Sequence, residues 1–316
     1  MDEVEQLLNN GEGDRSNKKK CLKYILIPIL GILIIGLVIF LVYFFILKGD
    51  KEEIEKELCQ YGYYLVNGTC EPYSFVATYH KVYADEEIKL IDGFYHRYIE
   101  KIYMNNLELE KTFNFNYNFS IGKHKIYFYM NISSLKSIDL MFYRANKMIT
   151  IDFTTNFNTE NITSMNSLFI ECNFLTSVNL SSFNTSSVTS MAKMFQHCVY
   201  LPFINLSNFD TSSVTDMTDL FGACLSLTSI ELSNFNTSSV LTIANIFSSC
   251  FSLKEINLPY FDTSSVTNMD NMFFNNMFLT SIIVSNFNTA NTLSMKEMFF
   301  ACESLTSIDV SNFDTS

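Results

Sequence analysis

Five cysteines recur at regular positions in the second half of this 316-residue chain, and they are its most regular candidates for chemistry. They are Cys172, Cys198, Cys224, Cys250 and Cys302. A zinc site needs closely spaced ligands that converge on one point, which one cysteine per 26 residues does not supply. A disulfide ladder is the sharper alternative, but we expect these cysteines on helices about 8–10 Å apart, beyond the reach of a disulfide. We therefore predict buried free thiols that pack as small hydrophobic side chains.

A column of Asn and Asp residues has the same spacing, and its oxygen atoms would suit calcium. Its members are Asn158, Asn184, Asp210, Asn236, Asp262, Asn288 and Asp314. Because Asn and Asp interchange and stand before a Thr at an expected turn, we predict side-chain to backbone hydrogen bonds instead. His80, His96 and His124 lack ligand spacing and are predicted to be surface or packing residues. We predict no catalytic, metal-binding or cofactor-binding residue and expect no enzyme.

The elements that carry these residues repeat every 26 positions from Leu175 onward. In each unit a V-x-L alternation indicates a short strand, and a Ser/Thr-rich turn follows. A row of apolar residues then falls on one stripe of a helix: Val188, Met191, Met194, Phe195 and Cys198. Ser213 and Asp216 have the spacing of a capping box at the start of such a helix. We predict an α/β fold, a solenoid of strand-turn-helix coils over residues 135–316, truncated without a C-terminal cap.

The N-terminal half predicts a membrane anchor. Residues 24–47 carry no charge, and this segment is long enough to cross a bilayer. Arg15 and several lysines precede it. The positive-inside rule then places residues 1–23 in the cytoplasm and the C-terminal part outside the cell or in a lumen. We predict a single-pass, type II signal anchor that holds the protein in the lipid bilayer.

Two segments link this anchor to the repeats. Residues 48–71 are predicted to be a stalk in which a Cys59–Cys70 disulfide closes a hairpin. Residues 72–134 contain short alternating segments with turn signals at Asn105-Asn106 and Gly122-Lys123, which predict a small antiparallel β-domain. A glycoprotein is expected, and the best candidates for N-glycosylation are Asn67, Asn118 and Asn131.

Charge limits the choice of partners. The net charge of −12 argues against nucleic acid, because phosphates would be repelled. The outward positions of the predicted strands are mostly Ser, Thr and Asn. Five residues depart from that background and are candidate partner-binding residues: Phe203, Glu231, Lys254, Glu255 and Ile283. The expected partner is an unknown extracellular protein or host surface.

The full repeat reads L-x-S-I-x-L-S-x-F-[ND]-T-S-x-V-x-x-M-x-x-M-F-x-x-C, and it resembles the 26-residue repeat of bacterial surface proteins. That repeat defines the BspA-like branch of leucine-rich-repeat proteins, and the resemblance covers about 141–316. Departures include Asn276 in place of the expected Cys and Thr292 in place of Val. The resemblance implies a non-enzymatic surface protein that acts in adhesion or protein recognition. Two alternatives stay open: a structural coat protein without a specific ligand, or a fragment whose functional module lies beyond Ser316.

Overall fold

The computed structural model describes residues 63–66, 69–84, 87–105, 107–110, 116–232, 234–258 and 260–314. The chain divides into two compact units, 1–71 and 72–316. Strands β1 (Tyr63–Val66) and β2 (Thr69–Pro72) pair in a two-stranded sheet. The predicted anchor at 24–47, the side chains of the predicted Cys59–Cys70 pair and the Asn67 sequon lie outside this description. Among the residues described, none belongs to a helix with the length and apolar character needed to cross a bilayer.

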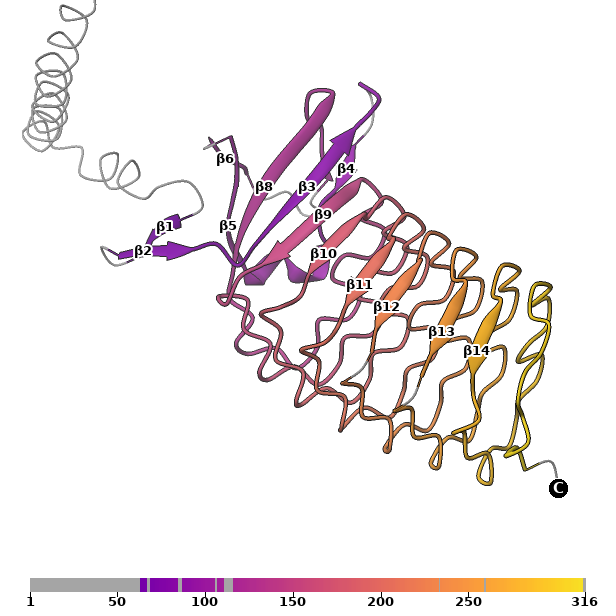
Figure 1. Ribbon diagram of the computed structural model, residues 1–316. Coiled ribbons are helices and arrows are strands. Elements are labelled where there is room, and N and C mark those ends of the chain that lie inside the picture. Colours follow the sequence, from indigo (N-terminus) through magenta and orange to yellow (C-terminus); the bar gives the residue numbers. More distant parts are fainter. Residues whose placement is uncertain are drawn as a thin grey trace, which may run out of the picture. The chain divides into compact units, whose positions relative to one another are not determined.

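An antiparallel sheet opens the second unit (Figure 1). Its neighbouring strands are β3 (Phe75–Lys81), β8 (Gly122–Met130), β5 (Ile99–Met104) and β6 (Leu107–Glu108). Along β3, buried residues alternate with more exposed ones, so one face of the strand packs on the core. The predicted turn after β5 is present, and Asn105 adopts a left-handed φ of 51° there. Strands β3, β8 and β5 thus pair antiparallel as predicted, but the turn predicted at Gly122-Lys123 is wrong, because these residues begin β8 and pair with Lys81 and His80.

Three short elements complete this region. Strands β4 (Ile88–Lys89) and β7 (Asn116–Tyr117) form a separate antiparallel pair. The 3-10 helix η1 (Gly93–Tyr98) begins after Asp92, whose side chain accepts a hydrogen bond from the Phe94 N–H.

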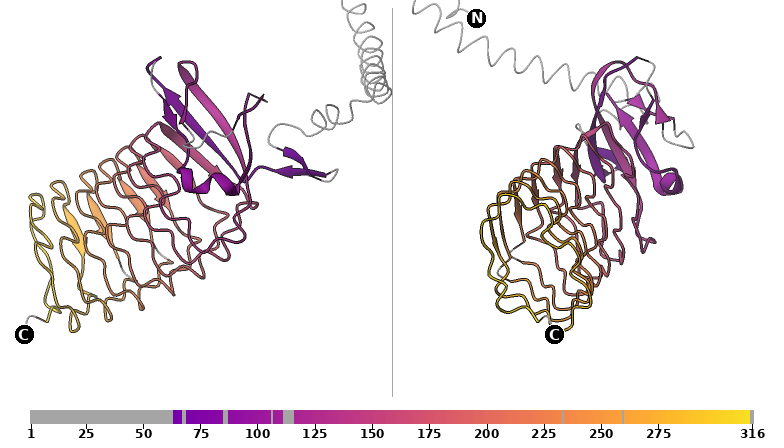
Figure 2. Two further views of the ribbon diagram at one scale, coloured as in Figure 1. Left: turned by 180° about the vertical axis from the view of Figure 1, so that it is seen from behind. Right: turned by 90° about the vertical axis from the view of Figure 1, so that its right-hand side faces the viewer.

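Strand β9 (Met148–Phe153) joins this sheet to the repeats. It pairs antiparallel with β3 on one side and parallel with β10 (Ser177–Asn179) on the other. The following strands are β11 (Phe203–Asn205), β12 (Ser229–Glu231), β13 (Glu255–Asn257) and β14 (Ser281–Ile283). β11 pairs in parallel with β12, and β13 with β14, each residue opposite the one 26 positions later. Figures 1 and 2 show the strands side by side along one face of what we call the coil stack, residues 137–314.

The predicted helix in each repeat is wrong. In the described part of the coil stack the apolar segment is a run of turns, and a pair of left-handed residues four positions apart recurs in every coil. Examples are Lys193 with His197 and Asp219 with Ala223, and φ lies between 53° and 61° throughout the recurring pairs. A right-handed helix cannot contain such residues. The capping role predicted for Ser213 and Asp216 fails with the helix.

Hydrogen bonds between coils explain why turns replace the helix. Alternate N–H groups donate to the next coil: Ser167 to the Ala192 carbonyl (2.8 Å) and Phe169 to the Met194 carbonyl (2.9 Å). N–H groups between them close three-residue turns within the coil, as from Cys172 to the Phe169 carbonyl (3.0 Å). The apolar spacing of three residues, which suggested one face of a helix, is therefore the spacing of successive turns.

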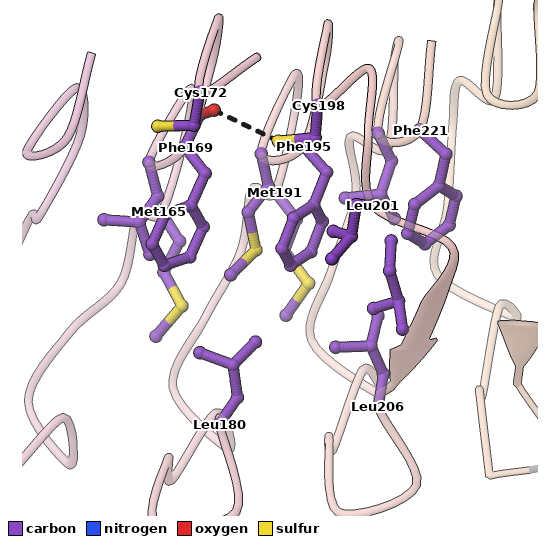
Figure 3. Packing of buried hydrophobic residues seen from close by; sticks show 14 of the residues in the cluster. Met165, Phe169, Cys172, Leu180, Met191, Phe195, Cys198, Leu201, Leu206 and Phe221 are labelled. Carbon is purple, nitrogen blue, oxygen red and sulfur yellow. Dashed lines mark hydrogen bonds between the residues drawn. The ribbon is translucent and has the colours of Figure 1, made fainter. Parts of the chain in front are cut away.

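Stacked aromatic rings form the core of the coil stack (Figure 3). In the main row, ring centroids of neighbouring coils lie 5.3–6.0 Å apart with interplanar angles of 7–15°. The row comprises Phe142, Phe169, Phe195, Phe221, Phe247, Phe273 and Phe299. A single coil has no second layer to cover its aromatic ring, so each ring is buried by the neighbouring coils.

Buried threonines supply a second, polar link between coils. The members are Thr159, Thr185, Thr211, Thr237, Thr263 and Thr289, each at most 2% exposed. Each hydroxyl donates to the backbone carbonyl of the Asn or Asp that lies 25 residues later, at 2.9–3.4 Å. In the same pairs, the Thr185 and Thr211 hydroxyls also accept the N–H of Asp210 (2.8 Å) and Asn236 (2.9 Å). This threonine ladder satisfies buried backbone groups that no strand partner reaches.

Candidate recognition surface

The cysteine column lies in the core and its thiols are free, as predicted. Cys172, Cys198, Cys224 and Cys250 are fully buried, and Cys302 is partly buried. The reason given from sequence is incorrect, however, because parallel coils lie only about 4.8 Å apart, within disulfide range. Each thiol instead donates to a phenylalanine carbonyl of the preceding coil, as Cys198 does to Phe169 (3.3 Å, Figure 3).

Burial makes these thiols poor nucleophiles. It raises the pKa of the Cys172, Cys198 and Cys224 thiols well above the ordinary range and that of Cys250 to about 12. A thiolate, the reactive form, is therefore strongly disfavoured. Asn276 stands where the repeat otherwise has Cys. Its side-chain amide nitrogen donates to the Phe247 carbonyl (2.8 Å), so the amide replaces the thiol in the hydrogen bond to the preceding coil.

The predicted turn bonds of the Asn/Asp column are present. Asn184 Oδ1 accepts the Ser186 N–H (3.1 Å) and hydroxyl (2.8 Å), and Asp210 does the same with Ser212. These bonds lower the pKa of the Asp210 carboxyl, although the residue is exposed. No group of three or more His, Cys, Asp or Glu that could hold a metal ion occurs among the residues described.

The other polar candidates each have their own hydrogen-bond partners or face solvent. Asn118 is exposed and its Oδ1 accepts a hydrogen bond from the buried Lys81 ammonium. Asn131 is exposed, and its Oδ1 accepts the Ser133 N–H (3.1 Å). His124 is buried, with Nε2 2.7 Å from the Ser120 carbonyl, whereas His80 is exposed.

The five residues singled out on the predicted strands all lie on the exposed face of β11–β14 or directly before a strand. Each central strand residue points toward the core, as Ile204 and Ile256 do, while its two neighbours face solvent. Phe203 is 48% exposed and Ile283 is 49% exposed, large values for apolar side chains in an ordered strand.

The strand pairing fixes which of these residues come together. Phe203 lies opposite Ser229, so Glu231 is its diagonal neighbour on the paired strand. Glu255 lies opposite Ser281 and is the diagonal neighbour of Ile283 in the same way. We call this surface, residues Phe203, Glu231, Lys254, Glu255 and Ile283, the strand face. It consists of two diagonal pairs on neighbouring strands, plus Lys254 immediately before β13.

Sequence reasoning missed the threonine ladder. Its signal was available, since a Thr stands at the same place in every repeat while its neighbours vary among Asn, Asp, Ser, Ala and Glu. An unvarying Thr at a turn indicates a hydroxyl with both a donor and an acceptor to serve.

Fold and surface together define a repeat protein of parallel coils with an exposed strand face. The chain belongs to the family described as "Mycoplasma protein of unknown function, DUF285", whose family model matches residues 107–203, 136–259 and 243–316. A leucine-rich repeat protein from Bacteroides ovatus is a solved structure with 19% identity and a TM-score of 0.32. That match covers 56% of this chain and 47% of the Bacteroides protein, so the chain spans about half of that protein's length. No curated protein matches the chain.

Proposed function

We propose that this protein is a non-enzymatic, BspA-like surface protein, anchored by residues 24–47, whose repeat solenoid recognises another protein through the strand face. Membership of a repeat family supports recognition as the general role. The observation that carries the proposal is the exposure of Phe203 and Ile283 among small polar neighbours in ordered strands.

Physical considerations favour a protein as the partner. A half-exposed aromatic ring offers a large rigid contact area, and aromatic residues are enriched where proteins bind one another. Glu231, Lys254 and Glu255 add charges of both signs at the margin of these apolar side chains. Such a rim gives specificity and orientation more than affinity. Because each of these strands is held by pairing with a neighbouring strand, little backbone conformational entropy would be lost on binding.

The test uses the full chain and a panel of immobilised extracellular-matrix proteins. Phe203→Ser and Glu231→Asn, combined, replace both residues by those found at the same positions in other coils, Ser177 and Asn205. We expect at least tenfold weaker binding to whichever panel protein the wild type binds, with an unchanged Tm. The matched control is Leu241→Thr, which also replaces an exposed apolar residue (50% exposed) by its equivalents Thr215 and Thr267, outside the strand face.

Two outcomes count against recognition by this face. One is a wild type that binds no member of the panel, and the other is a double variant that binds as well as the wild type. Either result favours the alternative of a coat protein without a specific ligand.

A further inference from the structure

A second exposed surface runs along the coil stack, formed by the two residues at the end of each turn segment, directly before the core leucine that leads into a strand. We call it the apolar edge. Its members in successive coils are Phe174; Val199 and Tyr200; Leu225; Phe251; Met277 and Phe278. The rings of Phe174 and Tyr200 lie 5.4 Å apart, so neighbouring coils present these side chains side by side.

The core does not account for these side chains. Phe174 is 47% exposed, Tyr200 is 52% exposed and Phe278 is 58% exposed, whereas the adjoining Leu175, Leu201 and Leu279 are fully buried. Three half-exposed rings leave roughly 300 Å² of aromatic surface in water. With the partly buried Val199, Leu225, Phe251 and Met277 added, the edge reaches about 500 Å², comparable with the largest apolar patch of a typical monomer, which is often functional.

The order of residues along the edge is self-complementary. Read from either end, the middle holds small residues, Ser226 and Ser252, with Leu225 and Phe251 beside them. One coil further out, Val199 and Tyr200 on one side mirror Met277 and Phe278 on the other. If two copies met in antiparallel fashion, Tyr200 would face Phe278 of the other copy and Leu225 would face Phe251, while the serines would allow close approach at the centre.

The charges at the two ends follow the same symmetry. At the first end, the Lys147 ammonium lies 5.4 Å from the centroid of the Phe174 ring. At the last coil, Glu303 is exposed at the place that Val199 occupies in its own coil. Antiparallel pairing brings each Lys147 toward the Glu303 of the other copy, whereas parallel pairing brings like charges together.

We propose that the apolar edge is the interface of a two-fold homodimer, with a second copy of this chain as its occupant. Each copy contributes about 500 Å², less than the roughly 800 Å² per partner of a standard stable interface. The dimer is therefore weak and concentration-dependent. It uses a different surface from the strand face, so it stands or falls independently of the proposed function.

Sedimentation equilibrium of the full chain in detergent tests the dimer. Tyr200→Ser combined with Phe278→Ser introduces the residue found at the same position in the coils of Ser226 and Ser252. We expect the dimer Kd to rise at least tenfold, with Leu241→Thr as the control that leaves it unchanged. Because every variant keeps residues 24–47, any association through that segment is common to all of them.

Charge reversal tests the antiparallel orientation. Lys147→Glu alone and Glu303→Lys alone should each raise the dimer Kd severalfold, and the double variant should restore it. A chain that stays monomeric at all accessible concentrations, or a dimer that none of these variants weakens, overturns the proposal. If the double charge variant is weaker than either single one, the antiparallel arrangement is wrong.

Discussion

At the scale of single residues, the threonine ladder shows how a polar group stabilises an apolar stack. The Thr211 side chain is fully buried, and its hydroxyl both donates to and accepts from the backbone of Asn236. A buried peptide group without a partner costs about 1–3 kcal/mol. The hydroxyl therefore contributes more by serving both backbone groups than its small size suggests.

Replacing Thr211 by Val should lower the free energy of unfolding by about 2–3 kcal/mol, because both Asn236 groups lose their partner while the shape of the side chain is kept. Thr215→Val is the control, since Thr215 is exposed and its equivalents include Leu241 and Leu293. Its effect should be within about 0.5 kcal/mol. Urea denaturation of both variants measures the difference. Equal effects would mean that the buried ladder bonds stabilise the fold no more than the exposed Thr215 side chain does.

Residue-scale predictions from sequence succeeded where the cause is local. The Asn184 side chain accepts a hydrogen bond from the N–H of Ser186, two residues later in the chain, so sequence is enough to predict that turn. The thiol of Cys198 bonds the Phe169 carbonyl, 29 residues earlier, which no local pattern reveals. Its burial was predicted from the repeat, but its partner required knowledge of how coils stack.

At the scale of elements, the helix prediction failed because two structures share one apolar spacing. Val188, Met191, Met194 and Cys198 fit a helical stripe as well as a series of three-residue turns. The deciding factor is the destination of the backbone N–H groups, such as that of Phe169, which bonds the next coil. The strands were predicted correctly because a V-x-L alternation has no competing interpretation at that length.

The left-handed turn residues lead to a prediction about this element. Ala223 has a φ of 57°, a conformation that costs a non-glycine residue about 1–2 kcal/mol. Ala223→Gly should therefore raise the free energy of unfolding by about 1 kcal/mol despite the flexibility of glycine. Ala192→Gly, in a neighbouring coil and outside the left-handed set, should instead lower it by about 0.5–1 kcal/mol. Thermal unfolding of the two variants measures both changes in stability. Changes of the same sign would contradict the left-handed conformation assigned to Ala223.

At the scale of the whole second unit, the coils behave as interchangeable layers. Residues pair with those 26 positions later, as Ile204 does with Ile230 and Ile256 with Ile282. Sequence predicted this stacking period from the recurring Leu and Phe. It did not predict that β9 would pair with β3, because the contact joins two segments with unrelated patterns.

Removal of one whole layer should be tolerated. Deletion of residues 228–253 takes out one period and connects Leu227 to Lys254, which occupies the position of Thr228. We expect a folded chain that unfolds cooperatively with a somewhat lower Tm, since each coil contacts only its neighbours. Deletion of the 22 residues 228–249 breaks the register and should abolish cooperative unfolding. If the two deletions unfold alike, the coils are not in register.

The threonine ladder bonds also bear on how a protein of this kind grows and folds. They span 25 residues of chain wherever they occur, at the first coil or the last. The entropy lost in closing each such loop is consequently the same for every layer and does not increase with the total length. Duplication of a 26-codon segment would add a coil without slowing the assembly of the others. The length of the coil stack is therefore a trait that is easily varied.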